Sequence, residues 1–277
     1  MGITYFYPAL SNRDYGWFRV GGPGLANCLF FAVNAYVHYK QHGTMGGAIF
    51  IEPTWRKFSI GPWIRREKDK RFYNSLFNVN GVSGLKKLLY RLLMSRKNTH
   101  IYNNLGNYFQ DFNTHIKDVN EYISGIIKPS TICNVPRNGL EKCVSMHVRL
   151  GDYLPHLRIP ITWYVGMAKE FKKKYSDIEI LLFSDGNDEE LKDLLALSNV
   201  KRVFYGNAFA DMYAISKTKM VIASDSTFSA WGAFIGQRPI LFNRRHFPPL
   251  YNGDIPEEVI GDEVYIPTSF EKILKSQ

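Results

Sequence analysis

Hydrophobic and polar positions along the second half of the chain follow two periods in turn. Past residue 140, short apolar runs are each followed by a segment whose apolar residues recur at helical spacing. Strands that alternate with helices in this way form a parallel sheet through right-handed crossovers, so we predict a Rossmann-like domain. The expected strands are Cys143–Val148, Ile178–Phe183, Val203–Phe204, Met220–Ala223 and Ile240–Phe242, and the expected helices are Thr162–Lys174, Asp188–Leu197, Asp211–Ser216 and Thr227–Gly236.

The first half shows fewer elements. Apolar residues at helical spacing predict a helix over Leu25–Lys40, directly after the glycine-rich turn Gly21–Gly24. Ala48–Ile51 is typical of a short strand, and Asp118–Ile127 of another helix. Lys128–Leu140 is rich in residues that interrupt regular structure, so we place a domain boundary in it.

This boundary predicts an N-terminal domain over residues 1–138 and a C-terminal domain over residues 139–277, both of ordinary size. No segment approaches the ~18–20 apolar residues that span a bilayer. The first residues lack the charged and apolar regions of a signal peptide, so we expect none. Three cysteines, without metal-ligand spacing, fit reduced thiols, so we expect a cytoplasmic protein.

The formal net charge of +10 is concentrated in one segment. Between Trp55 and His100, twelve Lys and Arg residues face two acidic ones, which indicates a local anionic partner such as a membrane surface. Within it, Gly84–Lys97 has the pattern of an interfacial helix at an anionic membrane, or of an ordinary surface helix with a solvated basic face. Its apolar stripe is Leu85, Leu88, Leu89, Leu92 and Leu93, and its basic residues are Lys86, Lys87, Arg91, Arg96 and Lys97.

Three of the expected strands end in polar residues. His147, Arg149 and Asp152 lie at the end of the first, Ser184–Gly186 at the second and Ser224–Thr227 at the third. Since the carboxyl ends of parallel strands lie along one rim, we expect these groups to converge where α/β sheets usually bind ligands.

The third group leads into a helix near Phe228. Its hydroxyl and backbone N–H groups would bind an anion with help from the helix dipole, or Ser226 and Thr227 would simply cap the helix. Arg149 on the same rim favours the anion, because a guanidinium facing such donors makes a diphosphate clamp. Asp211 is either an N-cap or a carboxylate that accepts two hydrogen bonds from guanine.

These motifs resemble those of the α-1,2-fucosyltransferases, glycosyltransferase family 11, and occur in that family's order. Thr162–Tyr164 also falls where the family often has an aromatic pair that opens a helix. Gly24–Phe30 resembles G-L-G-N-Q-L-F, His147–Tyr153 resembles H-x-R-R-G-D-Y, Phe183–Asp185 resembles F-S-D-D, and Ala223–Ala233 is similar to A-S-N-S-T-F-S-W-W-G-A.

The resemblance implies an α/β, GT-B-like fold of two Rossmann-like domains, the C-terminal one a parallel sheet with helices on both faces. It implies an inverting, metal-independent transfer of L-fucose from GDP-fucose to a hydroxyl of a glycan, such as the 2-OH of a β-galactoside. No cofactor besides the donor substrate is expected. A lipid-linked acceptor, as in surface polysaccharide or O-antigen synthesis, would account for Gly84–Lys97 and place the protein at the inner face of the plasma membrane.

Carried over by position, the resemblance also implies roles for single residues. Arg149 would bind the β-phosphate, and His147 and Asp185 would line the donor site. The remaining donor-binding residues would be Ser226, Thr227 and Phe228 on the diphosphate, Asp211 on the guanine, and Gly22, Gly24 and Asn27 facing the donor from the N-terminal domain.

An inverting transfer normally needs a base for the acceptor hydroxyl. Asp152, Asp185 and His147 are all candidates, and Asp152 is equally a turn residue that orients Arg149. The sequence does not choose among them.

The chain departs from the family pattern at five positions, and the site is less positive as a result. This leaves open a related transferase that uses another GDP-sugar. A non-enzymatic anion or nucleic-acid binder would also fit the charge, but the charge is confined to one segment and no nucleic-acid motif is present. Leu150 replaces an Arg, Gly186 an Asp, Asp225 an Asn, Ala26 a Gly and Cys28 a Gln.

Overall fold

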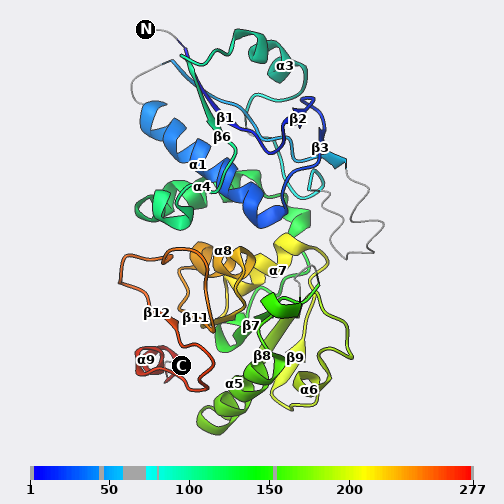
Figure 1. Cartoon of the computed structure of the whole chain (residues 1–277), viewed down its shortest axis with the longest axis vertical. Coiled ribbons are helices and arrows are strands. Elements are labelled where there is room, and N and C mark those ends of the chain that lie inside the picture. The colour runs from blue at the N-terminus through cyan, green and yellow to red at the C-terminus, as the bar shows by residue number, and fades with distance from the viewer. Residues whose placement is uncertain (1–2, 44–46, 59–72, 80, 152–154, 276–277) are drawn as a thin grey trace. The chain divides into compact units, whose positions relative to one another are not determined.

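The computed structural model describes residues 3–43, 47–58, 73–79, 81–151 and 155–275. The chain divides into two compact units, Met1–Thr131 and Ile132–Gln277. Each unit contains a parallel sheet with helices packed against it (Figure 1). The predicted α/β class with Rossmann-like units is therefore confirmed.

The second unit is built on six parallel strands in the order β12-β11-β10-β7-β8-β9. From β7 the chain first extends the sheet in one direction and then, with β10, in the other. The point where the strand order reverses lies between β7 and β10, which is the usual ligand position in such sheets. The strands are β7 Val144–Val148, β8 Ile180–Ser184, β9 Val200–Arg202, β10 Val221–Ala223, β11 Ile240–Phe242 and β12 Glu257–Val259.

Helices cover both faces of this sheet. On one face lie α5 (Ile161–Lys174), α6 (Lys192–Leu195) and α9 (Thr268–Lys275). Opposite them are α7 (Ala208–Ile215) and α8 (Thr227–Gly236), which pack against each other. Strand side chains alternate between the two faces, so successive residues of a strand pack against different sets of helices.

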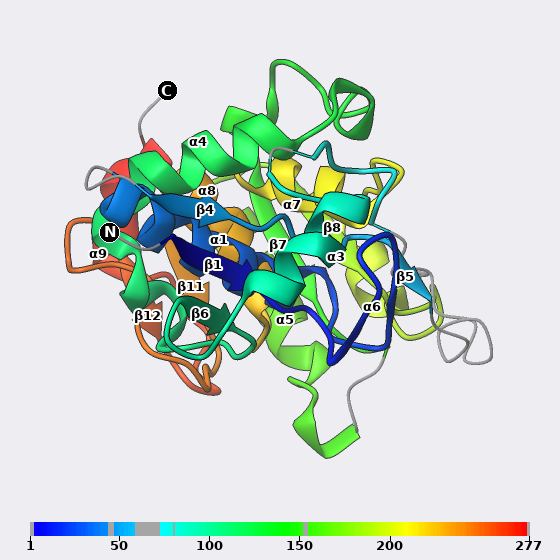
Figure 2. The same ribbon diagram turned by 90° about the horizontal axis from the view of Figure 1, so that it is seen from above.

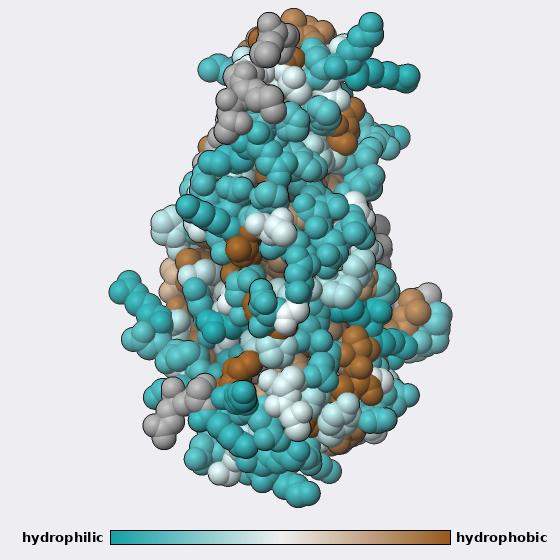
Figure 3. Space-filling model, turned by 90° about the vertical axis from the view of Figure 1, so that its left-hand side faces the viewer, coloured by the Kyte–Doolittle hydropathy of each residue, from teal (hydrophilic) through white to brown (hydrophobic). Residues whose placement is uncertain are grey.

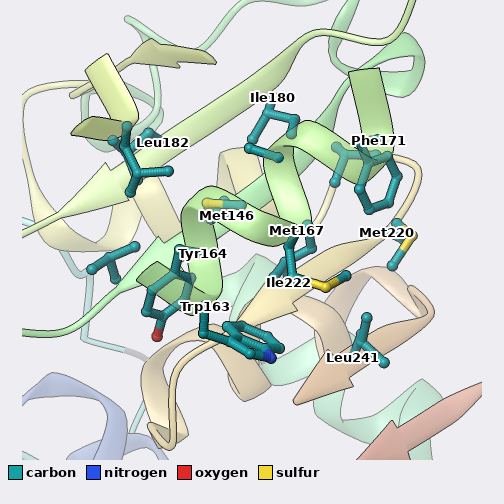
Figure 4. Close-up of a cluster of buried hydrophobic side chains, with 14 of the residues drawn as sticks. Met146, Trp163, Tyr164, Met167, Phe171, Ile180, Leu182, Met220, Ile222 and Leu241 are labelled. Atoms are coloured by element: carbon teal, nitrogen blue, oxygen red, sulfur yellow. The ribbon is translucent and has the colours of Figure 1, made fainter. Parts of the chain in front are cut away.

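The α5 face carries a large apolar core. Trp163, Met167 and Phe171 lie toward Met146 and Ile222 of the central strands (Figure 4). These side chains are almost fully buried, and each contributes about 1.5–3 kcal/mol by leaving water. This core fixes the central strands, so the groups at their carboxyl ends stand on a rigid base.

The first unit has a three-stranded parallel sheet in the order β4-β1-β6, made of β4 (Ala48–Phe50), β1 (Thr4–Pro8) and β6 (Thr99–Tyr102). On one face α1 (Leu25–Gly43) packs against the sheet, and α4 (Ile116–Ile126) lies beside it (Figures 1 and 2). On the other face lies α3 (Gly84–Leu93). A small second sheet consists of β2 Arg13–Asp14, β3 Arg19–Val20 and β5 Lys57–Phe58.

Three predicted elements differ from the structure. The strand predicted at Val203–Phe204 is wrong: β9 comes earlier, and Val203 only donates its N–H to the Leu182 carbonyl. The helix predicted over Asp188–Leu197 is confined to α6; before it, the side chains of Asn187 and Glu190 accept each other's backbone N–H, and residues 188–191 form turns. The helix predicted to reach Lys97 ends at Leu93.

Candidate functional site

The three strand ends predicted to converge do lie together on the rim of the second unit's sheet. Val148 of β7 is in register with Ser184 of β8, and the Ser184 hydroxyl donates to the Val148 carbonyl at 2.7 Å. On the other side of β7, the Ser224 N–H donates to the His147 carbonyl at 3.0 Å. The polar groups after β7, β8 and β10 therefore form one connected cluster at the reversal of strand order.

Arg149 is held by Asp185, the carboxylate that follows the neighbouring strand. Arg149 Nη1 lies 3.1 Å from Asp185 Oδ2, and both side chains are about one-quarter exposed. The Leu150 N–H donates to Asp185 Oδ1 at 2.8 Å. Burial would raise the pKa of Asp185, but Arg149 and the backbone N–H groups of Leu150 and Gly151 outweigh it and lower that pKa. Asp185 is thus an ionised group that orients the Arg149 guanidinium.

His147 is buried and uncharged. Burial, and then the nearby Arg149 cation, lower the pKa of His147 to about 3. Its Nδ1 lies 2.8 Å from the Ser224 hydroxyl, and its ring lies 5.1 Å from the Phe228 ring, centroid to centroid. These contacts fix the orientation of the imidazole between β10 and the start of α8.

The N-terminus of α8 opens onto the same rim. Ser226 caps it, since its hydroxyl accepts the Phe228 N–H at 3.2 Å, and Thr227 is the first helical residue. No acidic side chain lies in the first turn of α8. Capping by Ser226, one of the two predicted roles, is therefore present, and the helix end carries the partial positive charge that attracts anions.

Asp211 lies in the first turn of α7, the neighbour of α8. The N-cap of α7 is Asn207, so the prediction of Asp211 as the cap is wrong. Asp211 Oδ1 instead accepts the Tyr205 N–H at 2.8 Å. Burial raises the pKa of Asp211 to about 7, and the hydrogen bond from the Tyr205 N–H offsets only part of this effect.

Two departures from the family pattern are packed against each other. Leu150 is buried and joins the apolar core of the α5 face, so it points away from the polar cluster. A Cβ atom at Gly186 would lie only 2.6 Å from Leu150 Cδ1. An apolar residue at 150 and a glycine at 186 therefore fit together, and the cluster holds Arg149 without a second arginine at position 150.

A fourth polar group at a strand end, His246, was not among our predictions, and it contacts Asp225. Asp225 Oδ1 accepts the backbone N–H of His246 at 3.0 Å and lies 2.6 Å from His246 Nδ1. His246 follows β11, another strand of the same sheet, so the rule that located the first three groups would have located it too. Its imidazole faces the carboxylate that replaces an asparagine.

Gly22 and Gly24 lie in the first unit at the turn that leads into α1, and Asn27 lies in the first turn of α1. Gly22 has φ +89°, and a Cβ there would meet the carbonyl oxygen of Leu10 at 2.1 Å, so only glycine fits. The buried Arg19 side chain donates to the Gly21 carbonyl and to the Thr54 carbonyl, which fixes the turn.

Three further expectations concern Asp152, metal binding and membrane-spanning helices. Asp152 lies outside the described residues. Within the part of the chain that the structure describes, no cluster of three or more His, Cys, Asp or Glu side chains is placed to hold a metal ion. No helix in that part is long and apolar enough to cross a membrane.

Comparison with curated proteins gives one partial relative. The alpha-1,2-colitosyltransferase of Escherichia coli is 25% identical over 103 residues, which cover 33% of this chain and 36% of that protein. The match thus spans about a third of the relative's length.

One of the similar solved structures supports the fold. The NodZ alpha-1,6-fucosyltransferase soaked with GDP-fucose is similar with a TM-score of 0.50 and 15% identity, over 80% of this chain and 92% of that one. The fucosyltransferase NodZ from Bradyrhizobium gives a TM-score of 0.49 and 15% identity, over 80% and 93%. At such identities the likeness concerns the fold alone, which is GT-B-like.

A family match ties these observations together. Residues 92–241, just over half of the chain, match the family described as Glycosyl transferase family 11. The matched range includes all three strand ends that form the polar cluster. The chain therefore belongs to glycosyl transferase family 11.

Proposed function

We propose that this protein transfers L-fucose from GDP-fucose to a hydroxyl group of a glycan, with inversion and without a metal ion or further cofactor. The observation that carries the proposal is the convergence of Arg149 and the N-terminus of α8 at the reversal of strand order. A guanidinium and a helix N-terminus on one rim favour a ligand with adjacent negative charges, as a diphosphate has.

In this proposal Arg149 binds the β-phosphate and stabilises the charge that grows on the departing GDP. Asp185 is a positioning residue, because its contact with Arg149 sets the direction of the guanidinium. The diphosphate also accepts hydrogen bonds at the start of α8, from Ser226, Thr227 and the Phe228 N–H. There it replaces the Ser226 hydroxyl as the acceptor of that N–H.

His147 lines the donor site as a neutral ring that lies against the Phe228 ring at a tilt of 32°. Asp211 binds the guanine by accepting two hydrogen bonds, from N1–H and the 2-amino group. The acceptance requires the ionised carboxylate, so guanine binding lowers the pKa of Asp211 from its raised value.

We assign the role of general base to Asp152. The other two candidates are already engaged in the site: the buried His147, with a pKa lowered to about 3, contacts the Ser224 hydroxyl, and Asp185 pairs with Arg149. The alternative role for Asp152, orienting Arg149, is already filled by Asp185.

The acceptor we propose is the 2-OH of a β-galactoside, lipid-linked, in surface polysaccharide or O-antigen synthesis at the inner face of the plasma membrane. The first domain would supply the acceptor side, with Gly22, Gly24 and Asn27 facing the donor. The second would bind GDP-fucose. Product linkage analysis distinguishes this from other linkages, and NodZ is named for an α-1,6 linkage.

The test is release of GDP from GDP-fucose on addition of a galactoside acceptor, in the presence of EDTA. Arg149→Ala should lower the rate by at least about a hundredfold, the size of effect expected for one charge-stabilising donor. Arg158→Ala is a matched control, because Arg158 also pairs with a carboxylate at 3.1 Å and has the same 28% exposure. Equal turnover by Arg149→Ala and Arg158→Ala would exclude the role given to Arg149.

A second candidate function is transfer of another sugar from GDP. The E. coli relative is named for colitose, and Asp225, at the position of an asparagine in the family pattern, adds a carboxylate next to the start of α8. A panel of GDP-sugars compared by kcat/KM decides between the two. A higher kcat/KM with a sugar other than fucose would establish the second.

A further inference from the structure

Helix α3 in the first unit is oriented with a lysine inward and leucines outward. Lys87 is completely buried, whereas Leu92 is 82% exposed. The residues directed inward are Lys87, Tyr90 and the adjacent Met94, at positions i, i+3 and i+7. The exposed leucines of the helix are Leu85, Leu89, Leu92 and Leu93. An ordinary surface helix has the opposite arrangement, with its apolar side on the core.

A buried polar network holds α3 in this orientation. Lys87 Nζ lies 2.8 Å from Asp14 Oδ2 and donates to the Thr54 hydroxyl and the Glu52 carbonyl, each at 2.8 Å. Burial would raise the pKa of Asp14, but Lys87 and its other donors lower it. Rotating the leucines inward would remove the Lys87 ammonium from this carboxylate, which is strongly unfavourable. The outward leucines are therefore a fixed feature of the unit.

The same carboxylate ties α3 to the turn between β2 and β3. Asp14 Oδ1 accepts the Gly16 N–H at 2.9 Å, and the Arg91 side chain donates to the Asp14 carbonyl. Gly84 at the start of α3 packs against the Trp17 ring. The turn exposes three aromatic side chains, Tyr15, Trp17 and Phe18. We call these three and the four exposed leucines the docking face.

Positive charges surround the docking face. In residues 10–22 and 82–100, all of them described, the one acidic residue is Asp14, and it is buried. The exposed cations of these two segments are Arg13, Lys86, Arg91, Arg96 and Lys97. A second copy of the chain placed on this face would bring like charges together, whereas an anionic surface would be attracted.

On the face that Figure 3 shows, hydrophobic side chains occur in small groups among hydrophilic ones. The docking face combines an apolar helix side with an exposed tryptophan, which favours the boundary between lipid head groups and acyl chains.

We propose that the docking face binds the surface of an anionic phospholipid bilayer, with its leucines in the acyl region, Trp17 at the head groups and the cations on lipid phosphates. Binding of this kind needs both apolar burial and charge attraction. It concerns the first unit and is independent of the reaction proposed above.

The test is flotation of the full chain with vesicles of phosphatidylcholine, with or without phosphatidylglycerol. Wild type should float with the vesicles that contain phosphatidylglycerol and should not float with vesicles of phosphatidylcholine only. The triple variant Lys86→Glu, Arg96→Glu and Lys97→Glu should bind at least about a hundredfold more weakly, from about a fivefold contribution per cation. Lys172→Glu, Lys173→Glu and Lys174→Glu on α5 make the same change of net charge and should bind as wild type.

Leu89→Ser with Leu92→Ser should weaken binding at least about tenfold, while Val259→Ser, an exposed apolar residue of the second unit, should not. Failure of wild type to float would overturn the proposal. So would unchanged binding by the leucine variant, which would indicate adsorption by charge alone. Lipid-free dimers that the leucine variant abolishes would show that a second copy covers this face instead.

Discussion

Replacing Asp211 by Asn should raise the stability of the protein and lower its affinity for GDP. In the folded chain, burial raises the pKa of Asp211 from 3.8 to about 7. The unfolded chain keeps the ordinary value, so it ionises first as pH rises. The contribution of Asp211 to stability is therefore greatest below pH 4, falls as pH rises, and levels off above pH 7.

The size of this effect follows from the two pKa values. A difference of about three pH units, at about 1.4 kcal/mol each, amounts to about 4 kcal/mol above pH 7. At pH 5 only about 1.6 kcal/mol of it has been lost. Asn does not ionise and still accepts the Tyr205 N–H through its amide oxygen. The difference in unfolding free energy between the variant and wild type should thus grow by about 2–3 kcal/mol from pH 5 to pH 8.

Urea-unfolding series at pH 5 and pH 8, followed by circular dichroism, measure this gain. Asp193→Asn, an exposed position of α6 in the same unit, is the control and should show no such gain. Calorimetry with GDP at pH 8 should show weaker binding by Asp211→Asn. A variant that is no more stable at pH 8, or one that binds GDP as well as wild type, would refute this reasoning.

Three other predictions concern single positions. The dissociation constant of wild type for GDP should rise up to about tenfold per pH unit below pH 7, measured by calorimetry, because protonated Asp211 cannot accept both guanine hydrogen bonds. Gly22→Ala should cost about 2 kcal/mol or more in a urea series, whereas Gly253→Ala should cost less, since its φ is also positive but no atom lies within 4 Å of the new Cβ. Lys87→Met should cost about 3–5 kcal/mol in the same assay, because it leaves a buried carboxylate without its cation; a loss below 1 kcal/mol would contradict the account of α3.

The elements with clear periodicity were predicted best. The helix Thr227–Gly236 and the strand Ile240–Phe242 have the predicted bounds, because glycine, proline and capping residues mark their ends. The strand Thr4–Pro8 was not predicted. It is a short aromatic run buried on both faces, so it lacks the alternation that identifies a half-exposed strand.

The site was predictable where topology alone decides it. Parallel strands bring Arg149, Asp185 and Ser226 to one rim whatever their side chains do. The partner of each group was not predictable, because it depends on rotamers and tertiary distances. Arg149 pairs with Asp185, and Asp211 accepts the Tyr205 N–H instead of capping a helix. The orientation of α3 was likewise hidden, since it is decided by Asp14, remote in sequence from Lys87.

The packing of Leu150 against Gly186 has a consequence for how this site could have diverged. Restoring an arginine at 150 would place a guanidinium in the core of the α5 face, and restoring an aspartate at 186 would drive its Cβ into the leucine. The end of the leucine side chain that such a Cβ meets can shift, so the two positions are coupled without either change being forbidden. The cost of a residue larger than glycine at 186 therefore depends on the side chain at 150, and we expect mutational epistasis between the two positions.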